Sequence, residues 1–178
     1  MRSLLLSITI LLGVGLTACS VLPAAPPAPA VYDLGPLPAA QAQPAPLQLQ
    51  VRPDPGLEGT EIVYRLAYQD PRRYQSYRDS RWLAAPDALL ASRLAQTLRT
   101  AGALRLQLNS FEQVFASPRQ ASVHLRVRAT LELAARQRQR DFDLVLDAAP
   151  DAAGAVAALL LATDQLAVQL QAWLNTQT

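Results

Sequence analysis

The sequence predicts an α+β fold, a two-layer sandwich in which two main helices cover one face of an antiparallel-rich sheet. Several segments alternate apolar and polar residues, the period of a half-buried strand. Two other segments repeat their apolar residues at helical spacing. The order along the chain is strands, helix, strands, helix, and a single sheet with both helices on one face packs this order most economically.

The first group of strands is predicted over 47–51, 61–69 and 73–78. In the first of these, Leu47, Leu49 and Val51 alternate with glutamine and arginine. The last two segments are separated by a sequence typical of a turn, 69–72, so we expect them to form a hairpin.

The second group of strands is predicted over 104–115, 123–133 and 138–147. The alternation is clearest in 123–133, where every second residue is apolar. In 104–115 the alternation slips by one position near Asn109 and Ser110, which indicates a β-bulge.

The two helices are predicted over 86–101 and 150–174. The first has Pro86 and Asp87 in its first turn and Gly102 as its expected stop. Its apolar stripe is Leu90, Leu94, Leu98 and Ala101. The second helix is rich in leucine and alanine, but its Asp164 and glutamines make a membrane span costly, so we expect it to pack on the sheet.

The N-terminus is typical of an export signal. Arg2 precedes an apolar run from 4 to 16, which is too short to span a membrane. Leu16-Thr17-Ala18-Cys19 follows and resembles a lipoprotein cleavage motif. We therefore predict a signal peptide over 1–18, cleaved after Ala18.

Cys19 is the only cysteine, so the chain cannot form an internal disulfide. Lipidation of its thiol explains a lone cysteine in an exported protein. The alternative is an ordinary signal peptide with a chance cysteine. Ser20, in place of an aspartate that would retain the protein at the inner membrane, favours the periplasmic face of the outer membrane. A Pro/Ala-rich tether is expected over 19–46, within which 31–34 is predicted to pack as a short strand, and a folded domain over 47–178.

Candidate catalytic groups are sparse. The one histidine, His124, lies on the polar side of a predicted strand, without a nucleophile and acid that the sequence would place beside it. We expect a non-enzymatic protein with no cofactor and no metal site; an envelope hydrolase using His124 is the weaker alternative. A formal charge of +2 and an exported location disfavour nucleic acid as a partner.

The segment from Tyr64 to Trp82 interleaves tyrosines with arginines. Such residues are enriched in interface hot spots, so we predict a partner interface here. The alternative is that the rings pack on the core and the arginines stack over them or are solvated. The predicted interface residues are Tyr64, Arg65, Tyr74, Tyr77, Arg81 and Trp82.

The same segment carries a family resemblance. Ile62-Val63-Tyr64-Arg65, followed by Arg81-Trp82 and then Pro86-Asp87-Ala88-Leu89-Leu90, resembles the ABC-type transport auxiliary lipoprotein family. The cleavage motif, the segment 31–34 and the alanine-rich final helix are also similar to it.

This resemblance implies a non-catalytic auxiliary subunit anchored to the outer membrane. It implies as partners a periplasmic MCE-domain protein and an ABC permease and ATPase, which together move phospholipids or other hydrophobic substrates across the envelope. A homo-oligomeric ring would suit a tube-shaped partner. The alternative function is a periplasmic lipid-binding carrier that encloses an apolar cavity between its sheet and its leucine- and alanine-rich helices.

The export signal makes a direct prediction. The mature chain is expected to begin at Cys19 with several acyl chains attached, since stable anchoring requires more than one. Cys19→Ala is expected to prevent membrane attachment, because it removes the thiol through which the protein is lipidated. Intact-mass analysis of the protein from membranes checks both. An unmodified thiol, or a product that keeps residues 1–18, would contradict the lipoprotein hypothesis.

Overall fold

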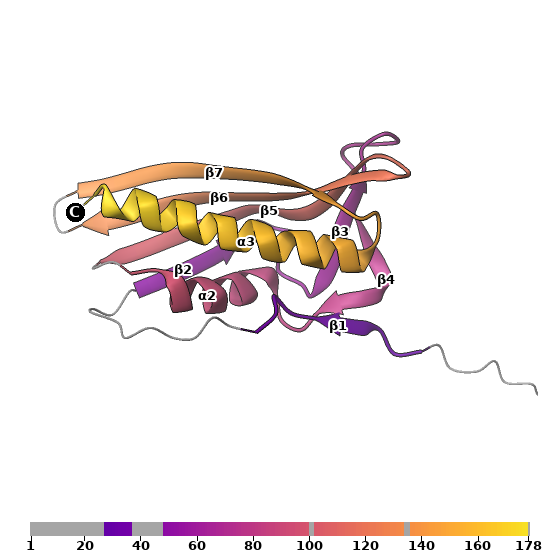
Figure 1. Ribbon diagram of the computed structural model, residues 1–178, viewed down its shortest axis with the longest axis horizontal. Coiled ribbons are helices and arrows are strands. Elements are labelled where there is room, and N and C mark those ends of the chain that lie inside the picture. Colours follow the sequence, from indigo (N-terminus) through magenta and orange to yellow (C-terminus); the bar gives the residue numbers. More distant parts are fainter. Residues whose placement is uncertain (1–26, 37–47, 100–101, 134–135, 178) are drawn as a thin grey trace, which may run out of the picture.

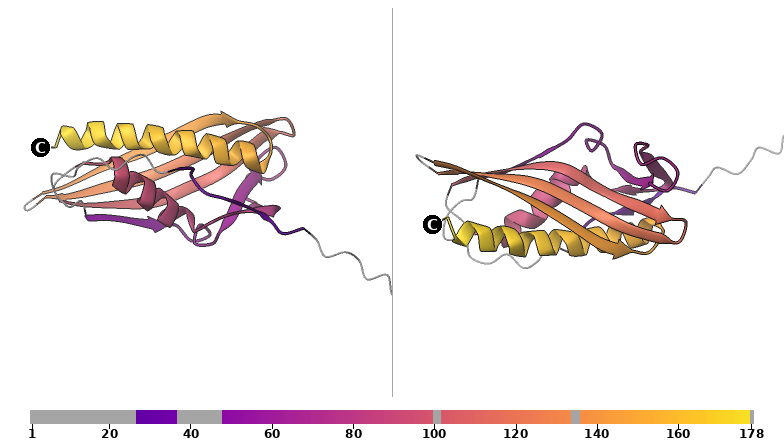
Figure 2. Two further views of the ribbon diagram at one scale, coloured as in Figure 1. Left: turned by 60° about the horizontal axis from the view of Figure 1, so that its bottom comes forward. Right: turned by 90° about the horizontal axis from the view of Figure 1, so that it is seen from above.

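A seven-stranded sheet with two helices on one face forms the protein, as the computed structural model shows (Figures 1 and 2). The structure describes residues 27–36, 48–99, 102–133 and 136–177. The predicted α+β sandwich is confirmed. The strand order is β1-β4-β3-β5-β6-β7, and β2 also pairs with β5.

Three long antiparallel strands form one half of the sheet. They are β5 (Ala103–Ser117), β6 (Gln120–Leu133) and β7 (Arg136–Ala148). Their apolar residues alternate with polar ones as predicted, and the apolar side faces the helices. The register of β5 against β6 shifts between Leu108 and Ser110, which confirms the predicted bulge.

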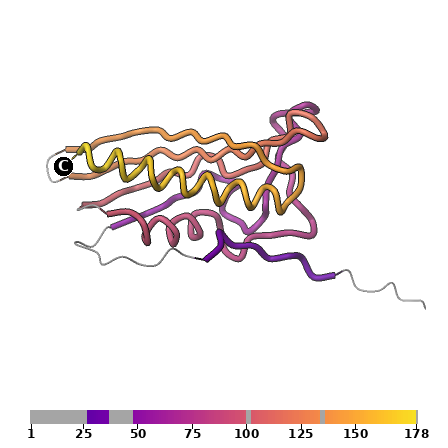
Figure 3. Tube along the Cα trace, in the orientation of Figure 1, coloured from indigo at the N-terminus to yellow at the C-terminus, as the bar shows by residue number. Residues whose placement is uncertain are grey.

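The other edge of β5 is shared by two strands. β2 (Gln48–Pro53) runs parallel to its first half, and β3 (Glu61–Leu66) runs parallel to its second half (Figure 3). These parallel pairings were not predicted, because strand alternation shows which residues face inward but not which strands are neighbours.

The predicted hairpin and the predicted short N-terminal strand close this side of the sheet. β4 (Gln75–Trp82) is antiparallel to β3, and β1 (Ala30–Tyr32) is parallel to β4. Leu34, just after β1, is 3% exposed within the hydrophobic core. The folded unit therefore includes residues that precede position 47, the predicted start of the domain.

Helix α2 (Pro86–Thr97) begins where predicted, and Leu90, Leu94 and Leu98 are buried. It ends earlier than predicted, because Leu98 has extended backbone. Gly102 is therefore not the helix stop. It lies at the entry to β5 with φ of +118°, and a Cβ there would stand 3.0 Å from the carbonyl oxygen of Glu132, so glycine fits both the backbone angle and the space.

Helix α3 (Ala152–Asn175) lies along β5, β6 and β7. Its N-cap is Asp151, whose carboxylate accepts a hydrogen bond from the Gly154 backbone N–H at 2.6 Å. By length and composition alone the helix could cross a membrane, but Leu159, Leu166 and Leu170 are at most 1% exposed against the sheet. The expectation that it packs on the sheet is confirmed.

A buried arginine joins the two helices to the N-terminal segment. Arg93 of α2 is 7% exposed and donates to both carboxylate oxygens of Asp164 on α3, through Nε at 2.7 Å and Nη2 at 3.0 Å. Its Nη1 donates to the carbonyl oxygens of Leu34 at 2.7 Å and Pro36 at 3.3 Å. One guanidinium group therefore stabilises three separate parts of the chain.

The N-terminal segment is shaped to reach this arginine. After β1, the Gly35 N–H donates to the Asp33 side chain at 2.8 Å, and Gly35 has φ of +73°, so the chain turns sharply here. The turn brings the Leu34 carbonyl toward Arg93 while the Leu34 side chain enters the core. The segment is thus held by strand pairing, apolar burial and a charge-assisted hydrogen bond together.

Arg93→Gln is expected to lower the free energy of unfolding by about 2–3 kcal/mol, because it removes the buried charge pair and leaves the Leu34 carbonyl with a weaker donor. The cost is below that of a fully buried pair because the Asp164 side chain is 47% exposed. Urea denaturation measures the change. Arg78→Gln, on the exposed side of β4, is the control and should change stability by about 0.5 kcal/mol or less. Equal urea midpoints for Arg93→Gln and wild type would contradict this role.

Candidate interaction surface

The β3–β4 hairpin and the adjacent part of β5 hold the predicted interface residues. The structure divides these residues between the core, an internal polar network and the exposed surface. Tyr64 and Arg65 lie on β3, Tyr74 lies in the connection, and the remaining residues lie on β4. The predicted surface is therefore smaller than the sequence pattern indicated.

Trp82 belongs to the core and not to an exposed interface. It is 1% exposed, and its ring lies 5.4 Å from that of Phe111. Its backbone N–H donates to the Thr60 carbonyl at 2.7 Å. The prediction that Trp82 contacts a partner is wrong, because this indole ring is buried in the hydrophobic core against Phe111.

Tyr64 and Tyr77 face the helix side of the sheet and contact each other, with ring centroids 4.8 Å apart. Phe115 packs edge-on against Tyr64 at 5.8 Å. The Tyr64 hydroxyl donates to the Gln75 side chain at 3.1 Å. These two rings therefore act mainly in packing the hairpin onto β5, which is the alternative that the sequence left open for them.

A buried amide links the hairpin to the start of α3. The Tyr77 hydroxyl donates to Oε1 of Gln113, which is 0% exposed, and Nε2 of Gln113 donates to the Ala149 carbonyl at 2.7 Å. Burial raises the pKa of Tyr77 to about 12, with smaller contributions from Tyr64 and Asp151. The phenol therefore stays neutral and keeps its role as donor well above physiological pH.

Arg65 is held on the opposite face of the sheet. Its Nε donates to Glu112 at 2.6 Å, its Nη1 donates to the Pro71 carbonyl at 2.9 Å, and its guanidinium carbon lies 3.6 Å from the centroid of the Tyr74 ring. Glu112 is 6% exposed and also accepts from the Ser110 hydroxyl at 3.0 Å. Burial lowers the pKa of Arg65, but the hydrogen bond and charge of Glu112 raise it further, so the net pKa lies above its ordinary value.

Arg65 and Tyr74 therefore brace the connection between β3 and β4. Glu112, Ser110 and Gln113 were missed as partners because the parallel pairing of β3 with β5 that brings them close cannot be read from strand alternation. The one available signal was the presence of polar residues at consecutive positions within an otherwise apolar strand.

His124 lies on this same open face, directly across from Glu112 in the β5–β6 register. Its Nε2 is 3.3 Å from the Ser122 hydroxyl, and it is half-buried. Burial, and then the charge of Arg126, lower its pKa, so the ring is neutral at physiological pH. Within the described residues no group of three or more His, Cys, Asp or Glu side chains could hold a metal ion.

What remains exposed is a set of tyrosine and arginine side chains on the β3–β4 connection and along β4, which we name the hairpin surface. Tyr68 and Tyr74 are 42% and 46% exposed, and Arg81 points to solvent from the end of β4. The hairpin surface comprises Tyr68, Arg72, Arg73, Tyr74, Arg78 and Arg81. Of the six predicted residues, Tyr74 and Arg81 are in it.

The predicted cleavage and lipidation positions, Ala18 and Cys19, lie outside the described residues. Their roles remain predictions from sequence. The described chain begins at position 27, three residues before β1, so β1 and the turn after it form the N-terminal part of the described fold.

Comparison with known proteins shows that this chain has the same fold as two solved structures. No family model matches the chain, and no curated protein matches it. A solved structure described as an uncharacterized protein superposes with a TM-score of 0.67 at 18% identity, covering 82% of this chain and 97% of its own. A second, a protein from Xanthomonas campestris described by the family model DUF330, superposes with a TM-score of 0.63 at 17% identity, covering 83% of this chain and 99% of its own.

These findings correct the family resemblance drawn from the sequence. No family model matches this chain, that of the ABC-type transport auxiliary lipoproteins included, and the structural neighbour from Xanthomonas campestris belongs to DUF330. At such low identity the neighbours establish the fold alone. The motifs behind the resemblance include Ile62 and Trp82, each 1% exposed, so part of that pattern reflects how this hairpin packs.

Tyr77→Phe is expected to cost about 1–3 kcal/mol of stability, because it leaves the buried Gln113 carbonyl oxygen without its donor. Wild-type stability should also fall as pH rises from 10 toward about 12, since the unfolded phenol ionises while the folded one resists ionisation. Thermal unfolding across this pH range measures both effects, and Tyr77→Phe should lack this part of the pH dependence. Tyr64→Phe, which removes a hydroxyl bonded to Gln75 and not to the buried Gln113, is the matched control. Equal stability of wild type and Tyr77→Phe would contradict the network.

Proposed function

We propose that the protein is a lipid-anchored, non-catalytic docking subunit at the periplasmic face of the outer membrane. It serves an assembly that moves phospholipids or other hydrophobic substrates across the envelope. The observation that carries this proposal is Leu16-Thr17-Ala18-Cys19 at the end of an export signal, followed by a proline-rich segment that leads to β1.

The attachment of the N-terminal segment supports a positioning role. A chain that leaves the membrane at Cys19 reaches the domain at β1, where Arg93 and the turn at Gly35 fix its direction. The distance between membrane and domain is then set by the short segment 19–29, and not by the whole of 19–46. An extended proline-rich chain spans about 3.1 Å per residue, so this segment could hold the domain tens of ångströms from the bilayer.

The hairpin surface supports the docking role. Tyrosine binds partners well because its rigid ring buries a large area at a low cost in conformational entropy. Arginine binds well because its planar guanidinium group donates several hydrogen bonds in a fixed geometry. Here Arg65 and Tyr74 already hold one another, so part of the surface is pre-organised. A periplasmic protein is the proposed partner, and an MCE-domain protein of an ABC-type transport system is the specific candidate to test.

The carrier alternative has less support. The carrier hypothesis was based on the many small residues of the helices, which could leave space for a lipid. Three of these residues are instead buried in the core: Ala155, Ala158 and Ala162 are at most 4% exposed. The apolar hollow of about 520 Å³ beside α3, which includes Val168 and Ala172 in its lining, opens on the surface. A docking subunit needs no internal lipid cavity, so we prefer it.

The test is recovery of partners from envelope membranes. Protein cross-linked in cells and purified through a C-terminal tag is expected to recover a periplasmic protein, and the double variant Arg78→Gln/Arg81→Gln is expected to reduce that recovery about tenfold, as loss of hot-spot arginines does. The double variant Arg136→Gln/Arg138→Gln, which removes two exposed arginines of β7, is the matched control and should leave recovery unchanged.

Two outcomes would contradict the proposal. One is that no periplasmic or inner-membrane transport protein is recovered with the wild-type chain. The other is that the hairpin variant recovers partners as well as wild type does while substrate transport stays intact. Recovery of an MCE-domain protein would identify the assembly.

A further inference from the structure

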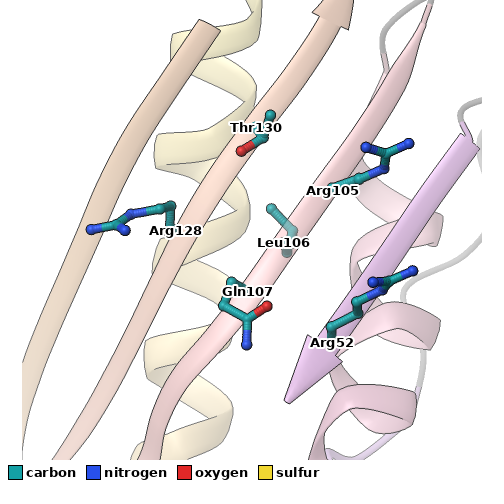
Figure 4. A pocket seen from close by; sticks show the side chains of 6 residues that line it. All are labelled: Arg52, Arg105, Leu106, Gln107, Arg128 and Thr130. Atoms are coloured by element: carbon teal, nitrogen blue, oxygen red, sulfur yellow. The ribbon is translucent and has the colours of Figure 1, made fainter. Parts of the chain in front are cut away.

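The face of the sheet away from the helices carries a basic hollow of about 350 Å³ (Figure 4). Strands β2, β5 and β6 contribute its lining. The registers pair Arg52 with Gln107, Gln107 with Arg128 and Arg105 with Thr130, so these side chains share one face in adjacent rows. The lining residues are Arg52, Arg105, Leu106, Gln107, Arg128 and Thr130.

Two of the three arginines lie on the same side of the hollow. In Figure 4 the guanidinium groups of Arg52 and Arg105 lie toward β2, whereas that of Arg128 extends over β7. Their hydrogen-bond partners explain this difference in direction. Arg128 donates to Asp141 of β7 through two nitrogens, at 2.7 and 3.3 Å, whereas Arg105 donates to Glu132 through Nη1 alone, at 2.6 Å. Arg105 therefore keeps donors for a further ligand, since a guanidinium group has five.

Arg52 has no ion-pair partner among the described residues. The acid two positions along, Asp54, is engaged by neutral amides: its Oδ1 accepts from Gln107 at 2.6 Å and its Oδ2 accepts from Asn109 at 3.1 Å. The Asp54 carboxylate therefore bonds to these amides and forms no ion pair with Arg52. Arg52 and Arg105 are diagonal neighbours on one face of β2 and β5, within reach of each other for long side chains, so an anion between them would reduce the repulsion of their like charges.

We propose that this hollow is a binding site for an oxyanion, a phosphate group above all, with Arg52 and Arg105 as its ligands. Planar guanidinium groups match the oxygens of a phosphate bidentately. Thr130 also lines the hollow, but its hydroxyl accepts from Gln139 of β7 at 3.3 Å, so we assign the anion to the two arginines alone. The phosphate is either a free anion or the headgroup of an anionic phospholipid, and both present the same chemistry to the arginines.

The site is separate from the hairpin surface. The hollow is formed around the first half of β5, which pairs with β2, whereas the hairpin packs on the second half. Loss of phosphate binding and loss of partner binding can therefore be measured independently, and this inference does not rest on the docking role.

The test is a titration of the full chain, in non-ionic detergent at constant ionic strength, with inorganic phosphate and with dihexanoyl-phosphatidylglycerol. Dihexanoyl-phosphatidylcholine, whose headgroup has no net charge, is the ligand control. NMR signals of the arginine Nε–H groups report which side chains bind. We expect the Arg52 and Arg105 signals to shift, and Arg52→Gln to weaken binding about tenfold.

Arg119→Gln is the control for bulk charge, because Arg119 is an exposed arginine in the turn at the far end of β5. It should change affinity less than about twofold, the size of a screened long-range effect. Tighter binding of the glycerol lipid than of phosphate would support a lipid headgroup as the ligand, and binding of phosphate alone would support a free anion. Absence of binding by both probes, or equal weakening by Arg52→Gln and Arg119→Gln, would overturn the proposal.

Discussion

A buried positive charge sets the arrangement of the helix layer. Arg93 is 7% exposed, and a guanidinium group so far from water must be paired and hydrogen-bonded. Asp164 supplies the negative charge and accepts from Nε and Nη2, and the Leu34 and Pro36 carbonyls accept from Nη1. These contacts fix α2 against α3 and, at the same time, fix the N-terminal segment against both. A change in any one of the three parts would leave a polar group without its partner, so each part helps to hold the other two in place.

The sheet follows a second constraint, the length of β5. On one edge β6 pairs with β5 along its whole length of 15 residues. On the other edge β2 and β3, each of 6 residues, pair with its two halves in succession. The bulge between Leu108 and Ser110 falls near the point where one neighbour ends and the other begins. As a result one strand supports two separate regions, the basic hollow along its first half and the hairpin along its second. The polar residues that serve the hairpin, Glu112 and Gln113, follow directly after the bulge.

Periodicity in the sequence predicts most of the secondary structure because each element has one apolar face. It predicts β6 and α3 well, since their alternation and stripe are uninterrupted. It fails at the end of α2, where the apolar stripe continues to Leu98 although the backbone is already extended. It also fails for the pairing of β3 with β5, and therefore for the partners of Arg65.

The burial of individual side chains was harder to predict than the elements. Arg93 was overlooked because a charged residue beside Leu90 and Leu94 is expected to be solvated until its partner on α3 is known. Burial of Trp82 could not be distinguished from exposure, since aromatic residues are frequent both in cores and at interfaces.

The most direct test of the central claim is amide hydrogen exchange at Leu83, whose backbone N–H donates to the Tyr32 carbonyl of β1 at 2.6 Å. If Arg93 holds the N-terminal segment in place, this amide is protected in the wild-type protein. In Arg93→Gln it loses that protection, while amides of β5 and β6 keep theirs, because local opening of one segment does not require global unfolding. Exchange of the Leu83 amide at the rate of an unprotected peptide in the wild-type protein would contradict the account.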